Sequence, residues 1–182
     1  MEDKLTFRKG SEKDLDRFLQ FFRTSVKTLF SDHYSPNSIN YTVDVDYGPK
    51  WMSSQLKKNR KKVFLSYYGN KITGYLFASK SIAGVGFADW LAVDKPYQKK
   101  GIASALLKMW EENEIKEGAH SLFLWTTKNN LDFYRGRGFK VGGEFPNAWH
   151  GVNTYLIYMN LREPKEENFL KNYLKKIKKN ES

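Results

Sequence analysis

The sequence predicts an α/β fold of the mixed α+β kind, in which a mixed, mostly antiparallel sheet of about seven strands is flanked by helices and followed by an extra C-terminal helix. Three observations support this prediction. Runs of β-branched and aromatic residues alternate with segments whose apolar residues recur every three to four positions. Gly69-Asn70 separates two strand-like runs and is a two-residue hairpin signal. One helical segment, 102–117, lies between two apolar strands, which indicates a parallel crossover.

The N-terminal third of the chain contains a strand, two helices and a loop. Residues 5–8 form a short strand, and Ser11 with Asp14 has the spacing of a capping box that opens a helix. The apolar residues of this helix mark one buried face, namely Leu15, Phe18, Leu19, Phe22, Val26 and Leu29. The polar and aromatic stretch 31–48 is expected to be a loop. A short helix begins at Pro49. Its inward residues are expected to be Trp51, Met52 and Leu56.

The central part of the chain supplies most of the sheet. Strands are predicted over 63–68, 71–79 and 85–93, the last of which is apolar enough for the interior of the sheet. A helix over 102–117 follows, and the next strand, 121–126, is a continuous apolar run. The crossover through this helix places the strands before and after it side by side and parallel.

Towards the C-terminus a short helix over 131–137 precedes a final antiparallel pair, 140–145 and 153–160. Residues 1–161 are therefore expected to form one domain, to which 162–182 adds a Lys-rich amphipathic helix. The apolar stripe of that helix consists of Phe169, Leu170, Tyr173, Leu174 and Ile177. We expect the helix to dock on the domain. Pairing with a second subunit in a homodimer and binding to an anionic surface are alternatives.

Composition limits the class of protein. The chain of 182 residues contains no cysteine, which excludes disulfide scaffolds, thiolate metal sites and cysteine nucleophiles. It has neither a secretory signal pattern nor an apolar run of the roughly 20 residues that span a bilayer. We therefore expect a cytoplasmic protein with no membrane partner. The net charge of +11 favours anionic partners, although a general Lys bias that maintains solubility explains it equally well.

The most informative segment is 90–104. A buried strand ends there, a turn carries Gln98, Gly101 and Ala103, and an amphipathic helix follows at once. A helix N-terminus presents unpaired N–H groups and a partial positive charge, so it binds phosphate. The small residues leave room for phosphate oxygens to reach the backbone, and two adjacent lysines add charge. This is not a Walker loop, because its lysines precede the glycine.

This segment resembles the pyrophosphate loop of the GCN5-related N-acetyltransferase family, which reads Gln/Arg-x-x-Gly-x-Gly/Ala after the fourth strand. A second segment, 133–139, resembles the Tyr-x-x-x-Gly-Phe ending of the family's following helix. Thr127 stands where many members have Asn, while Asn130 resembles another common variant. The resemblance covers roughly residues 4–160 and implies the family's fold and an acetyl transfer from acetyl-CoA to a primary amine.

The resemblance also implies how acetyl-CoA is held as co-substrate. Amides of residues 99–104 would hold the pyrophosphate, and backbone groups of 91–93 would pair with the pantetheine arm like an added strand. An amide of that strand would also polarise the thioester carbonyl and stabilise the oxyanion. The implied cofactor-binding residues are Leu91, Ala92, Val93, Gln98, Lys99, Lys100, Gly101, Ile102, Ala103, Ser104, Asn130 and Phe133.

Two residues are candidates for catalysis. By the resemblance, Tyr134 is the general acid for the departing thiolate, and the alternative is a tyrosine that only packs in the core. The attacking amine must be neutral, although its pKa is about 10.4. Asp89, on the strand that leads into the phosphate loop, is the candidate base, acting directly or through water. Alternatively, Asp89 only accepts hydrogen bonds from backbone N–H groups or from a neighbouring Tyr hydroxyl. Glu144 and His150 are weaker candidates.

The acceptor is expected to be a small-molecule or peptide amine, and the sequence leaves its identity and the acyl chain length open. The net charge argues against polycationic acceptors unless a local patch overrides it. Specificity is expected where Trp149-His150 meets the stretch 31–48. Aromatic candidates for the acceptor pocket are Tyr34, Tyr41, Tyr47, Trp51, Trp90, Trp125 and Trp149. No metal is expected, because the spacing of the histidines is not that of ligands: His33, His120 and His150.

Two other functions are compatible with parts of the sequence. A basic nucleic-acid-binding protein would also have a high positive charge and many aromatic residues. A regulatory module could bind acyl-CoA without turnover. The phosphate loop together with the segment around Tyr134 favours the enzyme over both.

Overall fold

The computed structural model describes residues 4–180, and a single mixed sheet forms its centre. The strand order is β1-β2-β3-β4-β5-β7-β6. All neighbouring strands are antiparallel except β4 and β5, which are parallel as predicted. The strands are β1 (Leu5–Lys9), β2 (Lys61–Tyr68), β3 (Lys71–Ser79), β4 (Val85–Val93), β5 (Ser121–Thr126), β6 (Lys140–Phe145) and β7 (Thr154–Asn160). The predicted fold class is therefore confirmed.

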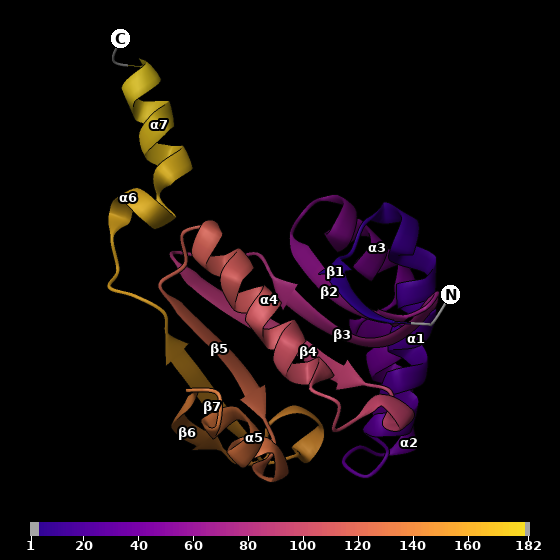
Figure 1. The fold of residues 1–182 in the computed structure, drawn as a ribbon. Coiled ribbons are helices and arrows are strands. Elements are labelled where there is room, and N and C mark those ends of the chain that lie inside the picture. Colours follow the sequence, from indigo (N-terminus) through magenta and orange to yellow (C-terminus); the bar gives the residue numbers. More distant parts are fainter. Residues whose placement is uncertain (1–3, 181–182) are drawn as a thin grey trace.

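Helices cover both faces of the sheet (Figure 1). Helices α4 and α5 pack on one face through a core that includes Leu106, Trp110 and Tyr134. Helices α1, α2 and α3 pack on the other face through a core that includes Phe22 and Tyr75. The helices are α1 (Leu15–Leu29), α2 (Pro36–Tyr41), α3 (Pro49–Lys57), α4 (Ile102–Lys116), α5 (Leu131–Arg135), α6 (Glu166–Phe169) and α7 (Lys171–Asn180). The sheet thus separates two apolar layers.

The stretch 31–48 is not the loop that the sequence suggested. It contains α2, followed directly by a π-helical turn over Thr42–Asp46. Ser35 caps α2 through its side chain, and a proline occupies the first turn. Ile39 and Val43 are buried in the core beside α1. The loop prediction was wrong because the helix has too few apolar residues to show a clear helical pattern. It is stabilised by the burial of Ile39 and Val43 against residues that are distant in the sequence.

Helix α3 starts at Pro49 as predicted, but Trp51 does not face inward. Met52 is 1% exposed, whereas Trp51 is 38% exposed. The Trp51 ring meets the edge of Tyr47, and the Lys61 ammonium lies 5.8 Å from its centre. Trp51 is therefore a partly covered surface residue, because its ring lies against Tyr47 and near the Lys61 ammonium and not in the core.

The C-terminal segment forms two helices where one was expected. Helix α6 docks on the domain, since the Phe169 ring lies 5.4 Å from that of His120 and the Asn168 carbonyl packs against Gly118. Helix α7 extends away from the body of the molecule (Figure 1), and Tyr173 is 60% exposed. Docking is therefore wrong for α7, which follows a break in the helix after Phe169.

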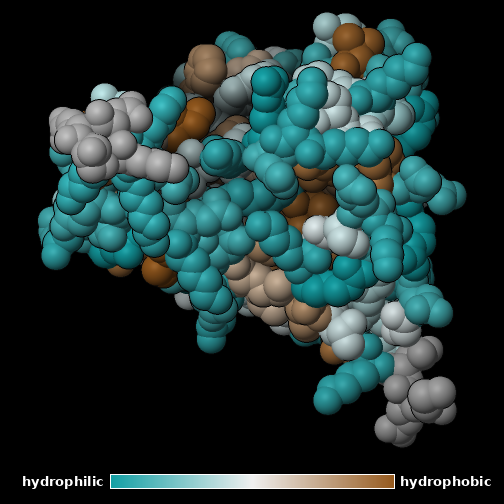
Figure 2. Space-filling model, turned by 90° about the horizontal axis from the view of Figure 1, so that it is seen from above, coloured by the Kyte–Doolittle hydropathy of each residue, from teal (hydrophilic) through white to brown (hydrophobic). Residues whose placement is uncertain are grey.

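The end of the molecule that carries α7 presents mostly hydrophilic side chains (Figure 2). A hollow of about 720 Å³ lies between α6–α7 and the end of α4. Six lysines line this hollow: Lys9, Lys62, Lys80, Lys116, Lys171 and Lys175. In the described part of the chain, no helix is long and apolar enough to cross a membrane.

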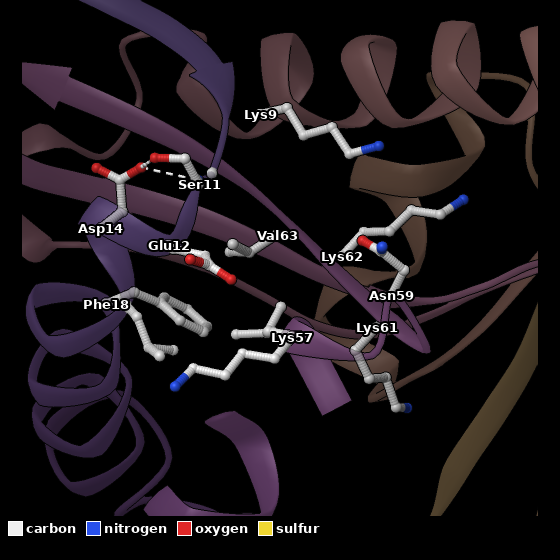
Figure 3. A pocket seen from close by; sticks show the side chains of 13 residues that line it. Lys9, Ser11, Glu12, Asp14, Phe18, Lys57, Asn59, Lys61, Lys62 and Val63 are labelled. Carbon is white, nitrogen blue, oxygen red and sulfur yellow. Dashed lines mark hydrogen bonds between the residues drawn. The ribbon is translucent and has the colours of Figure 1, made fainter. Parts of the chain in front are cut away.

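The entry into α1 is fixed by the buried carboxylate of Asp14. It accepts hydrogen bonds from the Ser11 amide at 2.8 Å and the Ser11 hydroxyl at 2.7 Å (Figure 3), which confirms the predicted capping box. It also accepts two hydrogen bonds from Arg8, at 2.6 and 2.5 Å, and one from the Tyr67 hydroxyl at 2.7 Å. The Arg8 guanidinium holds the pKa of Asp14 far below its usual range. Burial and the bond to Asp14 raise the pKa of Tyr67 to about 12.

The substitution Asp14→Asn should lower the free energy of unfolding at pH 7 by about 2 kcal/mol, because it leaves Arg8 and Tyr67 without their anion. The folded-state pKa of Asp14 is depressed, so its stabilisation is complete above the unfolded pKa of about 3.9 and is lost as the pH falls further. Urea denaturation of both proteins should therefore show a difference that shrinks below about pH 4. The exposed Asp16 on the same helix supplies the control, Asp16→Asn. Equal stability of the Asp14 variant and wild type at pH 7 would contradict this account.

Candidate functional site

Strands β4 and β5 separate halfway along β4 and leave a fork in the sheet. They pair only from Val85–Ala88 to Ser121–Leu124. On its other side, β4 pairs with β3, but there Ala78 faces Ala88 and Phe77 faces Trp90, so Asp89 is the extra residue of a β-bulge. A bulge bends its strand and increases the local twist. The edge of β4 beyond Ala88 is therefore unpaired on the β5 side within the described structure.

A cavity of about 460 Å³ passes through this fork from one face of the sheet to the other. From the side of α4 and α5 it is lined by Gln98, Asn130 and Tyr134. From the side of α1 to α3 it is lined by residues such as Tyr34 and Tyr47. The size is that of a small-molecule site. Of the predicted cofactor-binding residues, Leu91, Ala92, Val93, Gln98 and Asn130 line this cavity.

The phosphate loop ends at Gly101, which is the N-cap of α4 and has a φ of 78°. No atom lies within 4 Å of the position that a Cβ on Gly101 would occupy. The amides of the first turn, Ile102–Ser104, have no acceptor within the helix, because the first intrahelical hydrogen bond runs from the Ala105 amide to the Gly101 carbonyl. Gln98 donates from its side-chain amide to the Val93 carbonyl at 3.0 Å, which ties the loop to the end of β4. The residues present fit a pyrophosphate group.

Lys99 and Lys100 are exposed on the same loop, and the Ile102 side chain is buried in the core, so that only its backbone faces the open space. Lys99 has a φ of 59°, an unusual value for a residue with a side chain. The Lys100 ammonium lies 5.3 Å from the centre of the Tyr97 ring. The loop thus combines positive charge with a left-handed backbone conformation at Lys99. Such a conformation persists only where the surrounding structure fixes it.

Arg137 is a residue of this site that the sequence analysis did not select. Its Nε donates to the Ser104 hydroxyl at 2.9 Å, and its Nη1 donates to the Phe133 carbonyl. The guanidinium also lies 3.7 Å from the centre of the Phe133 ring. Arg137 therefore joins α4 to α5 and adds a cation beside the first turn of α4. The available signal was a second basic residue within the segment 133–139.

Tyr134 projects from α5 into the cavity with 7% of its side chain exposed. Its ring lies edge-on to Phe133 and Phe139, at 4.9 and 5.6 Å. Burial raises the pKa of Tyr134 well above its usual value. No described residue forms a hydrogen bond with its hydroxyl. Tyr134 is therefore protonated at neutral pH and can donate to a ligand.

Asp89 lines the same cavity but already has a partner. Its carboxylate accepts from the Lys61 ammonium at 2.6 Å and from the Ser79 hydroxyl at 3.3 Å. Only 5% of the side chain is exposed, and burial raises the pKa of Asp89 although the Lys61 charge opposes the rise. Sequence reasoning missed Lys61, because the two residues meet only through the pairing of separate strands. The pair places a buried carboxylate, hydrogen-bonded to a lysine, at the base of the fork.

The acceptor side of the cavity is closed by two distant segments. The His150 Nε2 and the Thr42 hydroxyl are 3.2 Å apart, and the His150 ring lies edge-on to Tyr34 at 5.3 Å. His150 holds a left-handed φ of 56°. The structure therefore brings Trp149-His150 against 31–48, as predicted. Glu144 does not line the cavity; its carboxylate accepts from the Tyr155 hydroxyl at 3.0 Å on the surface.

Five of the seven predicted aromatic residues line the cavity: Tyr34, Tyr47, Trp90, Trp125 and Trp149. Tyr41, which is 52% exposed, and Trp51 lie outside it. The cavity also has lining residues that the sequence analysis did not select: Phe30, His33, Asp46, Phe87 and Thr154. They lie on separate elements and share no motif, so only the fold brings them together. Among the described residues, no three His, Asp or Glu side chains gather as a metal site.

Comparison with known proteins agrees with this geometry. Residues 24–139, more than half of the chain, match the model of the family described as "Acetyltransferase (GNAT) family". PaiA N-acetyltransferase from Thermoplasma acidophilum, solved in complex with coenzyme A, is 20% identical with a TM-score of 0.72, over 86% of this chain and 99% of that one. No curated protein matches the chain at a significant level.

Two further solved structures are similar. The ribosomal-protein-S18-alanine N-acetyltransferase from Escherichia coli is 18% identical with a TM-score of 0.67, over 90% of this chain and 97% of that one. The yncA protein from Salmonella typhimurium, with its cofactor acetyl-CoA, is 18% identical with a TM-score of 0.69, over 89% of this chain and 96% of that one. At these identities the likeness to the solved structures shows the fold.

The substitution Gly101→Glu should weaken acetyl-CoA binding by about 100-fold or more, because it strains a left-handed position and puts a carboxylate in front of the helix N-terminus. Calorimetric titration with acetyl-CoA measures the effect. Gly143→Glu is the matched control, since a side chain on Gly143 of β6 also enters open space. Unchanged binding by a folded Gly101→Glu protein would show that phosphate does not bind at this loop.

Proposed function

The chain belongs to the GNAT acetyltransferase family and has its acetyl-CoA-binding fold, and we propose that it moves an acetyl group from acetyl-CoA to a primary amine. One arrangement carries the proposal. The unpaired edge of β4 runs from the phosphate loop into a cavity that contains a buried, protonated tyrosine, Tyr134. An anionic, extended thioester and a small amine are ligands that this arrangement can bring together.

The donor would bind along the fork. The backbone of β4 from Leu91 to Val93 would pair with the amides of the pantetheine arm, in the same way as a peptide adds to a sheet edge. Amides of residues 99–104 would hold the pyrophosphate. The positive charges of Lys99, Lys100 and Arg137 lie around that position and favour the bound anion.

The transfer would proceed by direct attack. The neutral amine nitrogen attacks the thioester carbonyl carbon, and a tetrahedral intermediate forms whose oxyanion accepts from a backbone amide of β4. When the intermediate collapses, the carbon–sulfur bond breaks and the thiolate takes the proton of the Tyr134 hydroxyl. The proton that the attacking nitrogen loses passes to a base and on through water to the Tyr134 phenolate, so the acid is restored and the products are an amide and a free thiol.

Asp89 is the proposed base for the amine proton. An amine of pKa about 10.4 arrives mostly as an ammonium ion, so a proton acceptor near the cavity is required. The ion pair with Lys61 supports an anionic Asp89 despite its burial. The proton reaches the carboxylate directly or through a water molecule in the fork. Tyr134, whose pKa is raised by burial, would then donate a proton, while Asp89, which is paired with Lys61, would accept one.

The substitution Tyr134→Phe should lower kcat by about 100-fold, at the low end for a general acid because a thiolate is already a fair leaving group. The KM for acetyl-CoA should change little, because the ring still packs between Phe133 and Phe139. Release of free thiol in steady state measures both parameters. Tyr155→Phe on β7, outside the cavity, is the control. An unchanged kcat would show that Tyr134 only packs in the core. Absence of turnover by the wild-type protein with every amine of a panel would instead favour a regulatory module that binds acyl-CoA.

A further inference from the structure

The acceptor end of the cavity is largely aromatic. Phe30 and Tyr47 both meet Trp90 edge-on, at 4.9 and 5.5 Å. Across the fork, Trp125 and Trp149 meet at 5.3 Å and form a second aromatic wall. Trp149 is 51% exposed, so this wall lies at the mouth of the cavity. Two aromatic walls that face a gap are suited to a flat apolar group and to a cation placed over ring faces.

The charge of this cavity is opposite to that of the protein. Its charged lining residues are Asp46 and Asp89, and none is Lys or Arg, although the chain has 31 such residues and a net charge of +11. In the described structure Asp89 pairs with Lys61, which does not line the cavity, whereas Asp46 forms no ion pair. The lysine-lined hollow lies at the other end of α4. The lining in the described structure therefore offers an incoming cation one exposed and unpaired carboxylate, that of Asp46, without a competing Lys or Arg side chain.

We propose that the acceptor is a cationic arylalkylamine. Its ring would lie between the two aromatic walls. Its ammonium would enter near Asp46 and reach Asp89 before it loses a proton. Amino acids with a free carboxylate are disfavoured by the two aspartates, and aliphatic polyamines lack the aromatic body that the walls require. The acetylation of this amine rests on the proposed function, whereas its binding in the cavity does not.

The test uses a probe that cannot be acetylated, the N,N,N-trimethyl derivative of tyramine. Titration of the full chain, followed by tryptophan fluorescence and by calorimetry, should show it binding about tenfold or more tighter than uncharged 4-ethylphenol or than hexyltrimethylammonium. Trp149→Ala and Asp46→Asn should each weaken the binding by about fivefold or more. Trp51→Ala and Asp16→Asn are the matched controls, because both residues lie outside the cavity. Equal binding of the three probes, or binding that neither cavity variant changes, would overturn the proposal.

A second measurement separates the substrate class from the proposed reaction. Thiol release from acetyl-CoA is followed with tyramine, hexylamine, spermidine and tyrosine as acceptors. Preference for tyramine supports both proposals, and preference for another amine refutes the substrate class while the transferase stands. If the trimethyl probe binds as expected but no amine is acetylated, the cavity assignment holds and the proposed reaction fails.

Discussion

The separation of β4 from β5 is the constraint on which the site depends. The strands pair over four residues, Val85–Ala88, and the bulge at Asp89 then bends β4 away. An open strand edge inside a sheet is normally a liability, because its polar groups need partners. Here the edge opens towards a cavity and ends at the phosphate loop, so a ligand can supply those partners. The fork also joins the two faces of the sheet, which lets donor and acceptor approach from opposite sides.

Charge is arranged along this fork in an order that suits the proposed chemistry. The helix N-terminus and the cations Lys100 and Arg137 lie at the donor end, and Asp46 lies at the acceptor end. Between them Tyr134 keeps its proton because it is buried, while Asp89 is paired with a lysine. The same cavity therefore contains a buried phenol and a lysine-paired carboxylate, because the surroundings of the two groups differ.

Local sequence signals predicted most of the fold, and contacts between distant segments account for what they missed. Strand runs, the hairpin at Gly69-Asn70 and the parallel crossover were readable, because each depends on neighbouring residues. The phosphate loop was readable for the same reason. Helix α2 was missed although Ser35 and a following proline mark its start, because its stability comes from burial against α1. The Asp89–Lys61 pair depends on strand pairing, so no sequence spacing encodes it.

The most direct test of the account is a crystal structure of the protein with coenzyme A. The account predicts pantetheine amides paired with the backbone of Leu91–Val93, the pyrophosphate in front of Gly101, and the thiol within hydrogen-bond reach of the Tyr134 hydroxyl. Coenzyme A bound outside the fork would contradict it. So would a fork that is closed by pairing of β4 with β5 beyond Ala88, because the donor would then have no edge to join.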